Sequence, residues 1–188
     1  MGTIVVTTFS SLDGVVQAPG GEDFKYANWT FDFDRGADGE KFKNDEALGA
    51  DALLIGRRTY EGFAAAWPNY AGELADKYNS MPKYVVSSTL TDPPWNNTQV
   101  LSGGLGEVVT RLKSEVASEI QVPGSIQLVQ GLLAADLVDE TRLMTFPVIL
   151  GTGRRLFGET PEKTRWKLTQ SVSFGEGIPV TVYRRDLT

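Results

Sequence analysis

Two residue types that dominate enzyme active sites are missing from this chain of 188 residues, which has no cysteine and no histidine. Without cysteine there is no disulfide framework, no thiolate nucleophile and no cysteine zinc site. Without histidine there is no Ser-His-Asp triad, no imidazole metal ligand and no imidazole proton shuttle. Any proton transfer must therefore use carboxylates, tyrosine, lysine or water.

The chain also lacks a basic surplus and a long apolar run. Its net charge is -6, whereas general nucleic-acid binders usually carry positive charge. No apolar run is long enough to span a membrane, and polar residues interrupt the start of the chain, as they would not in a secretion signal. We therefore expect a cytoplasmic protein that binds neither nucleic acid nor membrane. No calcium-loop spacing occurs, and we predict no metal site.

The apolar pattern predicts strands that alternate with helices, followed by a hairpin. Short β-branched or apolar runs indicate strands at residues 3–9, 51–56, 83–88, 98–101, 119–122 and within 137–146. Helices are predicted at 40–48, from 59, at 73–79, at 104–117 and after 125. Residues 166–174 and 178–184 alternate around a glycine turn, which is typical of an antiparallel hairpin. We predict an α/β fold in one domain over 1–188, with a mostly parallel sheet, flanking helices and an antiparallel edge.

The stretch from Ala50 to Phe63 places a buried strand directly before a helix. Gly56 ends the apolar run and permits a tight turn. Arg57, Arg58 and Thr59 follow at the expected helix start, where backbone N–H groups lack partners. A guanidinium binds phosphate through two parallel hydrogen bonds, so this stretch is a candidate phosphate site. The alternative is an ordinary turn with two solvated arginines, and the stretch alone does not decide between them.

Ligands of open α/β sheets bind outside the carboxyl ends of the strands. Four segments of this chain would meet there, namely 11–16, 56–59, 87–89 and 124–125. The long loop 17–39 is typical of a binding loop or a lid, and its alternative is a surface meander that buries its aromatic residues. Residues 151–156 begin like a dinucleotide fingerprint but carry leucine at the third glycine position, so we interpret them as a turn.

In this order and spacing the motifs resemble the dihydrofolate reductase-like superfamily. They are most similar to the reductase domain of bacterial riboflavin biosynthesis, which is joined to a deaminase in a bifunctional enzyme. The similarity covers almost the whole chain and is carried by Ser11-Leu12-Asp13-Gly14-Val15, 50–61, Ser87-Ser88, Gly124-Ser125, 137–140 and 146–153. It implies a central, mainly parallel sheet with NADPH lying across its carboxyl edge.

The resemblance also implies which residues contact NADPH. Arg57, Arg58 and Thr59, after Gly56, would hold the 2′-phosphate and the pyrophosphate. Ser87 and Ser88 would lie beside the adenosine ribose phosphate. The remaining contacts would come from Gly124, Ser125 and Ile126 at the pyrophosphate and nicotinamide side, and from the backbone of Phe9 and Val16 beside the carboxamide. The chain departs from the family at Ser125, which replaces the second glycine of a pair, and in 17–39, which lacks the expected substrate-phosphate pattern.

These inferences give one leading function and two alternatives. The leading hypothesis is an NADPH-dependent reductase that transfers a hydride to a small planar heterocycle, aminouracil-like or pterin-like. Asp13 or Glu40, or a water that one of them orients, would supply the proton. Asp13 could instead only shape its turn, and Glu40 could only favour a helix N-terminus. The alternatives are a non-catalytic NADPH-binding protein or sensor, and a plain interaction domain. The resemblance further implies a homodimer.

Overall fold

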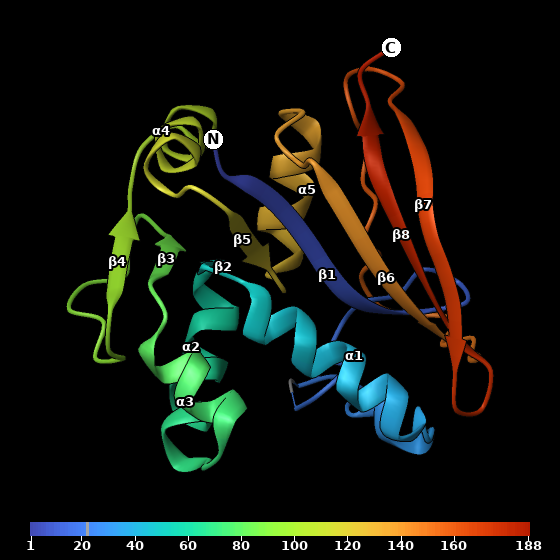
Figure 1. The fold of residues 1–188 in the computed structure, drawn as a ribbon. Helices are drawn as coiled ribbons and strands as arrows, with labels where there is room; N and C mark the ends of the chain where they lie inside the picture. Colours follow the sequence, from blue (N-terminus) through green and yellow to red (C-terminus); the bar gives the residue numbers. More distant parts are fainter. Residues whose placement is uncertain (22) are drawn as a thin grey trace.

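The computed structural model describes residues 1–21 and 23–188, in which eight strands form one sheet (Figure 1). The order across the sheet is β4-β3-β2-β5-β1-β6-β8-β7. The strands are β1 Thr3–Ser11, β2 Ala52–Gly56, β3 Lys83–Val86, β4 Thr98–Leu101, β5 Glu119–Val122, β6 Glu140–Phe146, β7 Arg165–Phe174 and β8 Ile178–Asp186. Pairs from β4 to β6 are parallel, and β8 pairs antiparallel with both β6 and β7. The predicted α/β fold with a mostly parallel sheet and an antiparallel C-terminal hairpin is confirmed.

Helices cover both faces of this sheet. The α-helices are α1 Gly36–Gly49, α2 Arg57–Ala66, α3 Glu73–Ser80, α4 Leu105–Glu115 and α5 Ile126–Ala134, and the short 3-10 helices are η1 Trp29–Asp32 and η2 Trp67–Asn69. In Figure 1, α1, α2 and α3 lie in front of the sheet, and α4 and α5 lie behind it. None of the helices in the described part of the chain is long and apolar enough to cross a membrane.

The strand β2 explains why the sheet needs both layers. Leu53 and Ile55 belong to the apolar cluster on the side of α2 and α3, whereas Leu54 belongs to the cluster beneath α4 and α5. All three side chains are fully buried. Full burial of such a side chain contributes about 1.5–3 kcal/mol. A strand buried on both faces therefore reads as a continuous apolar run, which is how this strand could be predicted.

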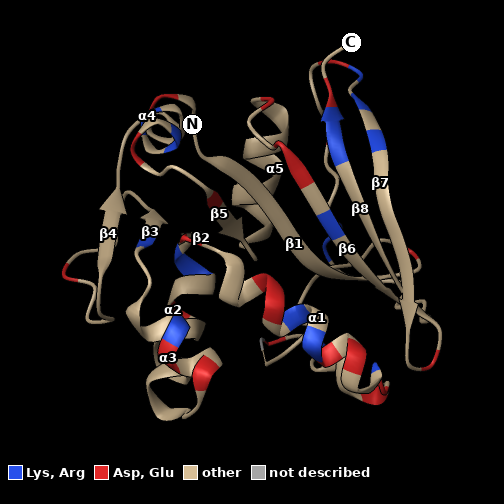
Figure 2. Ribbon diagram, viewed as in Figure 1, with Lys and Arg blue, Asp and Glu red and all other residues tan. Residues whose placement is uncertain are grey.

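A network of charged side chains joins α1 to the sheet. Glu46 pairs with Lys43 on the same helix and accepts a hydrogen bond of 3.1 Å from Thr7 Oγ1 of β1. On β6, Arg142 donates to both carboxylate oxygens of Glu119, at 3.0 and 2.7 Å. Figure 2 shows acidic and basic positions interspersed along α1, with further charges on β6 and β8. Because desolvation offsets much of the attraction in buried ion pairs, we interpret this network as a device that positions α1.

The structure shifts some predicted boundaries. The helix α1 begins at Gly36 instead of residue 40, and α2 begins at Arg57 instead of residue 59. The loop 17–39 contains η1, in which Trp29 is buried and donates a 2.9 Å hydrogen bond from Nε1 to Gln17 O. That part of the loop packs on the core, as the meander alternative predicted, because its aromatic side chains have apolar surface to bury.

Candidate functional site

The carboxyl ends of β2 and β5 bring two helix N-termini together. The helix α2 begins directly after β2, and α5 begins after the turn that follows β5. Because β2 and β5 are parallel neighbours, both helices start at the same sheet edge. Gly56 N donates to Gly124 O across the two turns, at 3.4 Å. The first turns of α-helices carry unpaired N–H groups and a partial positive charge, so this edge is suited to an anion.

The contact between the two turns leaves no room for a side chain at either glycine. A Cβ atom at Gly56 would lie 2.0 Å from Ser125 Oγ and 3.1 Å from Ser125 Cβ. A Cβ atom at Gly124 would lie 2.7 Å from Thr59 Oγ1. The peptide bond between Gly124 and Ser125 is cis. Each turn therefore packs against a hydroxyl side chain of the other, Gly56 against Ser125 and Gly124 against Thr59.

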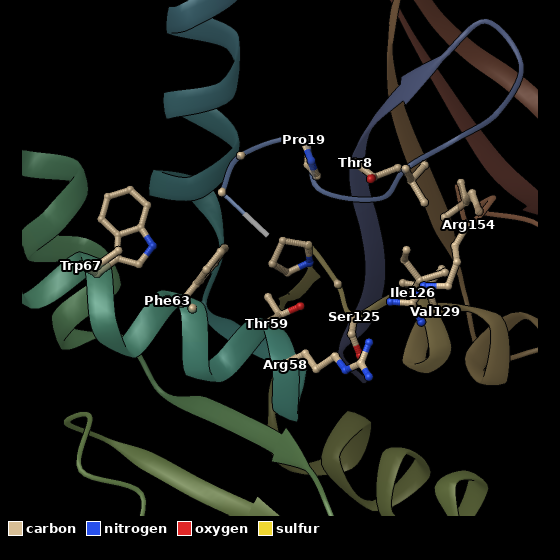
Figure 3. Close-up of a pocket in the computed structure, with 18 of the residues that line it drawn as sticks. Thr8, Pro19, Arg58, Thr59, Phe63, Trp67, Ser125, Ile126, Val129 and Arg154 are labelled. Carbon is tan, nitrogen blue, oxygen red and sulfur yellow. The ribbon is translucent and has the colours of Figure 1, made fainter. Parts of the chain in front are cut away.

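A cavity of about 460 Å³ lies beside these turns (Figure 3). This volume falls within the range of about 300–1,000 Å³ that small-molecule sites occupy. Its walls are formed by β1 and the following loop, by α2 with the segment after it, by the turn into α5, and by the loop after β6. The lining residues are Thr8, Val16, Pro19, Gly20, Gly21, Arg58, Thr59, Gly62, Phe63, Ala66, Trp67, Tyr70, Pro123, Gly124, Ser125, Ile126, Val129, Arg154 and Leu156.

The cavity has an aromatic side and a cationic side. Phe63 of α2 and Trp67 of η2 have ring centroids 6.2 Å apart in an edge-to-face arrangement. Figure 3 shows Arg58 beside Ser125, and Arg154 beside Ile126 on α5. These two arginines are the charged residues among the described residues that line the cavity. The arrangement therefore combines a surface for a planar apolar group with positive charge for an anion.

The neighbouring Arg57 points elsewhere. Its Nε donates to Glu61 at 2.7 Å, and its Nη1 donates to Thr89 Oγ1 at 2.7 Å. Both contacts are exposed, and Arg57 does not line the cavity. The structure thus separates the two adjacent arginines that the sequence grouped as one phosphate site.

The sequence of the chain matches the RibD C-terminal domain over residues 2–180. The chain belongs to the RibD C-terminal domain family. The uncharacterized protein YwjB of Bacillus subtilis (strain 168) is 26% identical over 174 residues, which are 93% of this chain and 93% of that protein.

Two solved structures confirm the fold of this RibD C-terminal domain. A protein from Shewanella sp. PV-4 that is assigned provisionally to riboflavin biosynthesis has a TM-score of 0.80 and 23% identity, covering 98% of this chain and 99% of that one. Dihydrofolate reductase from Enterococcus faecalis, complexed with NADP(H) and RAB-propyl, has a TM-score of 0.66 and 14% identity, covering 98% of this chain and 96% of that one. At these identities the likeness establishes the dihydrofolate reductase-like fold alone.

The serines after β3 lie along the same sheet edge but outside the cavity of this RibD C-terminal domain. Ser87 Oγ accepts hydrogen bonds from the backbone N–H groups of Thr89 and Leu90, at 3.2 and 3.0 Å. Ser88 is exposed. Because Arg57 bonds to Thr89, the end of β3 and the start of α2 together form an exposed polar rim.

Asp13 forms a clamp between two loops. Its carboxylate accepts hydrogen bonds from Leu150 N at 3.1 Å, from Gly151 N at 3.0 Å and from Ser11 Oγ at 2.7 Å. The bond from Ser11, assisted by the two backbone bonds, lowers the pKa of Asp13 below its ordinary value. A carboxylate with a lowered pKa is a poor proton donor, and Asp13 does not line the cavity. The geometry favours the alternative in which Asp13 shapes its turn.

Glu40 does not face the cavity either. Both of its carboxylate oxygens accept hydrogen bonds from Arg35, at 2.7 and 2.9 Å, and its side chain is 56% exposed. Glu40 is not among the buried positions of α1, which are Gly39, Glu46 and Ala47, and it does not line the cavity. The structure therefore does not support Glu40 as the carboxylate of a substrate pocket, because its side chain pairs with Arg35 and is exposed to solvent.

The two predicted contacts from the first strand and its loop have different surroundings. Val16 is buried and lines the cavity. The side chain of Phe9 instead contacts Phe146 edge-to-face at 5.6 Å, in the core cluster under α1. Because successive residues of a strand point to opposite faces, its neighbour Thr8 is the one that lines the cavity.

Several lining residues lay outside the sequence-based site. Trp67 lines the cavity and also packs on Tyr78, with the two ring centroids 4.3 Å apart. Arg154 was part of the rejected glycine motif. No local pattern could reveal it, because its position depends on a bridge between Val15 and Arg155, which are far apart in the sequence.

Proposed function

We propose that this RibD C-terminal domain is an NADPH-dependent reductase acting on a small planar heterocycle, aminouracil-like or pterin-like. The observation that carries the proposal is the cavity at the switch point of the sheet, where two helix N-termini and Arg58 converge. Cavities at such switch points are where open α/β sheets bind nucleotides. The solved dihydrofolate reductase of the same fold was complexed with NADP(H), which supports the choice of cofactor.

The residues present fit a dinucleotide. Gly56 and Gly124 let the two turns approach to hydrogen-bond distance, so the first turns of α2 and α5 start close together and both would favour a phosphate. Thr59 and Ser125 add hydroxyl groups at the cavity wall. On the rim, Arg57 would hold the 2′-phosphate, with Ser87 and Ser88 nearby. When bound, NADPH supplies the hydride.

The substrate side is defined by the aromatic residues. Phe63, Trp67 and Tyr70 give a planar ring a surface for stacking, which is worth about 0.5–1.5 kcal/mol per aromatic pair beyond burial. Proximity and orientation of this ring would provide most of the rate gain. No carboxylate occurs among the described lining residues, so we expect the proton to come from water.

The experiment is a binding and turnover assay on the whole chain. NADPH oxidation is followed by absorbance with a panel of aminouracils and pterins, and NADPH binding is measured separately by calorimetry. Binding together with oxidation by one class of heterocycle supports the reductase. Binding without oxidation by any of them would favour the non-catalytic alternative, which the missing carboxylate makes worth testing. Absence of binding would contradict both.

We also propose that the protein is a homodimer. Ile149, next to β6, is 71% exposed, and Leu168 of the hairpin is 50% exposed. Exposed apolar side chains in these two segments could supply apolar surface to the homodimer that the resemblance implies. Light scattering of the parent should give twice the chain mass, and Ile149→Asp or Leu168→Asp should shift the mass toward the monomer. A monomeric parent would contradict this part of the proposal.

A further inference from the structure

The arginines of the chain differ in whether they have a carboxylate partner. The chain has ten arginines. Within the part of the chain that the structure describes, eight of them form a salt bridge. The other two are Arg58 and Arg154, and both line the cavity. In a chain with a net charge of -6, the two arginines that form no salt bridge with a described carboxylate both lie at one cavity.

The backbone around Arg154 is held firmly in position. Val16 N donates to Arg154 O at 3.0 Å, and Arg154 N donates to Gln17 Oε1 at 3.0 Å. The preceding Gly153 is packed so tightly that a Cβ atom there would lie 2.7 Å from Val15 Cγ1. The loop is thus fixed on the segment after β1, and the guanidinium has no hydrogen bond to any described residue.

The two arginines come from different elements and line the same part of the cavity as the start of α5. Arg58 comes from the first turn of α2 and lies beside Ser125, the residue before α5. Arg154 comes from the loop after β6 and lies beside Ile126 and Val129 of α5 (Figure 3). An anion in this part of the cavity could therefore be bound by two guanidinium groups from separate elements. A diphosphate has two negatively charged phosphate groups, and each of them can accept hydrogen bonds from one guanidinium group.

We propose that Arg154 and Arg58 hold the diphosphate of a dinucleotide between them, while Arg57 on the rim recognises the 2′-phosphate. The inference rests on the proposed function, and it divides the three arginines between two parts of the cofactor. Arg58 and Arg154 contact the part that NADPH and NADH share. Arg57 contacts the single group by which the two cofactors differ, because its side chain points out of the cavity towards Thr89.

The test compares dissociation constants of NADPH and NADH by calorimetry for Arg154→Gln, Arg57→Gln and Arg111→Gln. We expect Arg154→Gln to weaken both cofactors by the same factor, about ten- to a hundredfold, as loss of one charged hydrogen-bond partner does. Arg57→Gln should weaken NADPH alone. Arg111, an exposed residue of α4, is the matched control for loss of one positive charge, and its substitution should change neither constant.

Two results would overturn the inference while leaving the proposed cofactor intact. One is unchanged binding of both cofactors by Arg154→Gln, and the other is weakened binding of NADPH only. A second measurement does not depend on NADPH. Inorganic pyrophosphate should raise the melting temperature of the parent and of Arg111→Gln, and should raise that of Arg154→Gln much less. Equal shifts in all three proteins would also overturn it.

Discussion

The sharpest structural prediction concerns Gly56, because it tests the contact between the two turns directly. A methyl group there would lie 2.0 Å from Ser125 Oγ, 3.1 Å from Ser125 Cβ and 3.4 Å from Ser125 N. The hydroxyl can rotate away, but the Cβ and N atoms can move only if the turn before α5 moves. Gly56→Ala is therefore an overpacking substitution, which costs about 1–3 kcal/mol.

That cost can be measured in two ways. For a chain of this length each kcal/mol lowers the melting temperature by about 2–4 °C, so Gly56→Ala should melt about 2–12 °C below the parent. Binding of NADPH should weaken as well, because the displaced turn carries Ser125 and the start of α5. Urea unfolding at constant temperature gives the free energy independently.

The reasoning is tested by the background in which the substitution is made. In Ser125→Gly the Cβ and Oγ atoms that the new methyl group would strike are absent. Gly56→Ala should then cost much less, and the double-mutant cycle should give a coupling of about 1–2 kcal/mol. Gly49→Ala, at a position with no heavy atom within 4 Å of the added Cβ, is the matched control and should be neutral or nearly so. A Gly56→Ala protein as stable as the parent would refute the reasoning, as would an equal loss in both backgrounds.

Three further predictions concern single side chains. Arg57→Ala should weaken the binding of NADPH by about tenfold to a hundredfold and leave the binding of NADH nearly unchanged, and Arg57→Lys should weaken NADPH binding less. Calorimetry that showed equal losses of affinity for both cofactors would contradict this. Asp13→Asn should destabilise the protein above pH 4 and should reduce the loss of stability on acidification. The carboxylate of Asp13 has a lowered pKa in the folded state, so it contributes stability above its unfolded pKa of about 3.9. This contribution is lost as the pH falls through the folded pKa. Urea unfolding from pH 2 to 7 measures this, and parallel stability curves for parent and variant would count against the clamp. Lys83→Met should lower the free energy of unfolding by about 1–3 kcal/mol near pH 7. The reason is that the buried ammonium group of Lys83 donates hydrogen bonds to the carbonyl oxygens of Asn79, Met81 and Asn96. Burial lowers the pKa of Lys83 only to about 8, so the group is still largely protonated at pH 7. An equally stable Lys83→Met protein would show that these carbonyl groups do not need the lysine.

The elements of the fold could largely be predicted from local patterns. The strand at 119–122 and the strand at 98–101 were placed within their observed bounds, since β-branched residues and flanking turns mark both ends. The order of strands could not be read in the same way. The insertion of β5 between β1 and β2 depends on packing between distant segments, which local patterns do not encode.

In the candidate site, too, local sequence patterns revealed some features, whereas others depend on residues that are distant in the sequence. Gly56 and Gly124 were identifiable because each sits where a strand meets a helix, which is a local signal. The separate directions of Arg57 and Arg58 were not predictable, because they depend on Thr89 and on the cavity wall. The hydrogen bonds of Asp13 were not predictable for a related reason, since the amide groups of Leu150 and Gly151 that it binds lie more than a hundred residues away.

The charge network beneath α1 gives both Glu46 and Glu40 basic partners outside the cavity. The buried carboxylate of that helix is Glu46, which already has Lys43 and Thr7 as partners. The exposed Glu40 has Arg35. Both acids are therefore explained by structure, and the substrate side of the cavity is left with aromatic and hydroxyl groups. Glu40→Gln should accordingly leave turnover unchanged in any assay that detects the reductase.

The most direct test of the central claim is the melting temperature of the parent protein as NADPH is added. A single site that binds only the folded state contributes about 2.7 kcal/mol at a hundredfold excess over the dissociation constant. At about 2–4 °C per kcal/mol, the melting temperature should then rise by about 5–11 °C, with a smaller rise for NADH at equal concentration. An unchanged melting temperature at millimolar NADPH would contradict the claim that this cavity is a cofactor site.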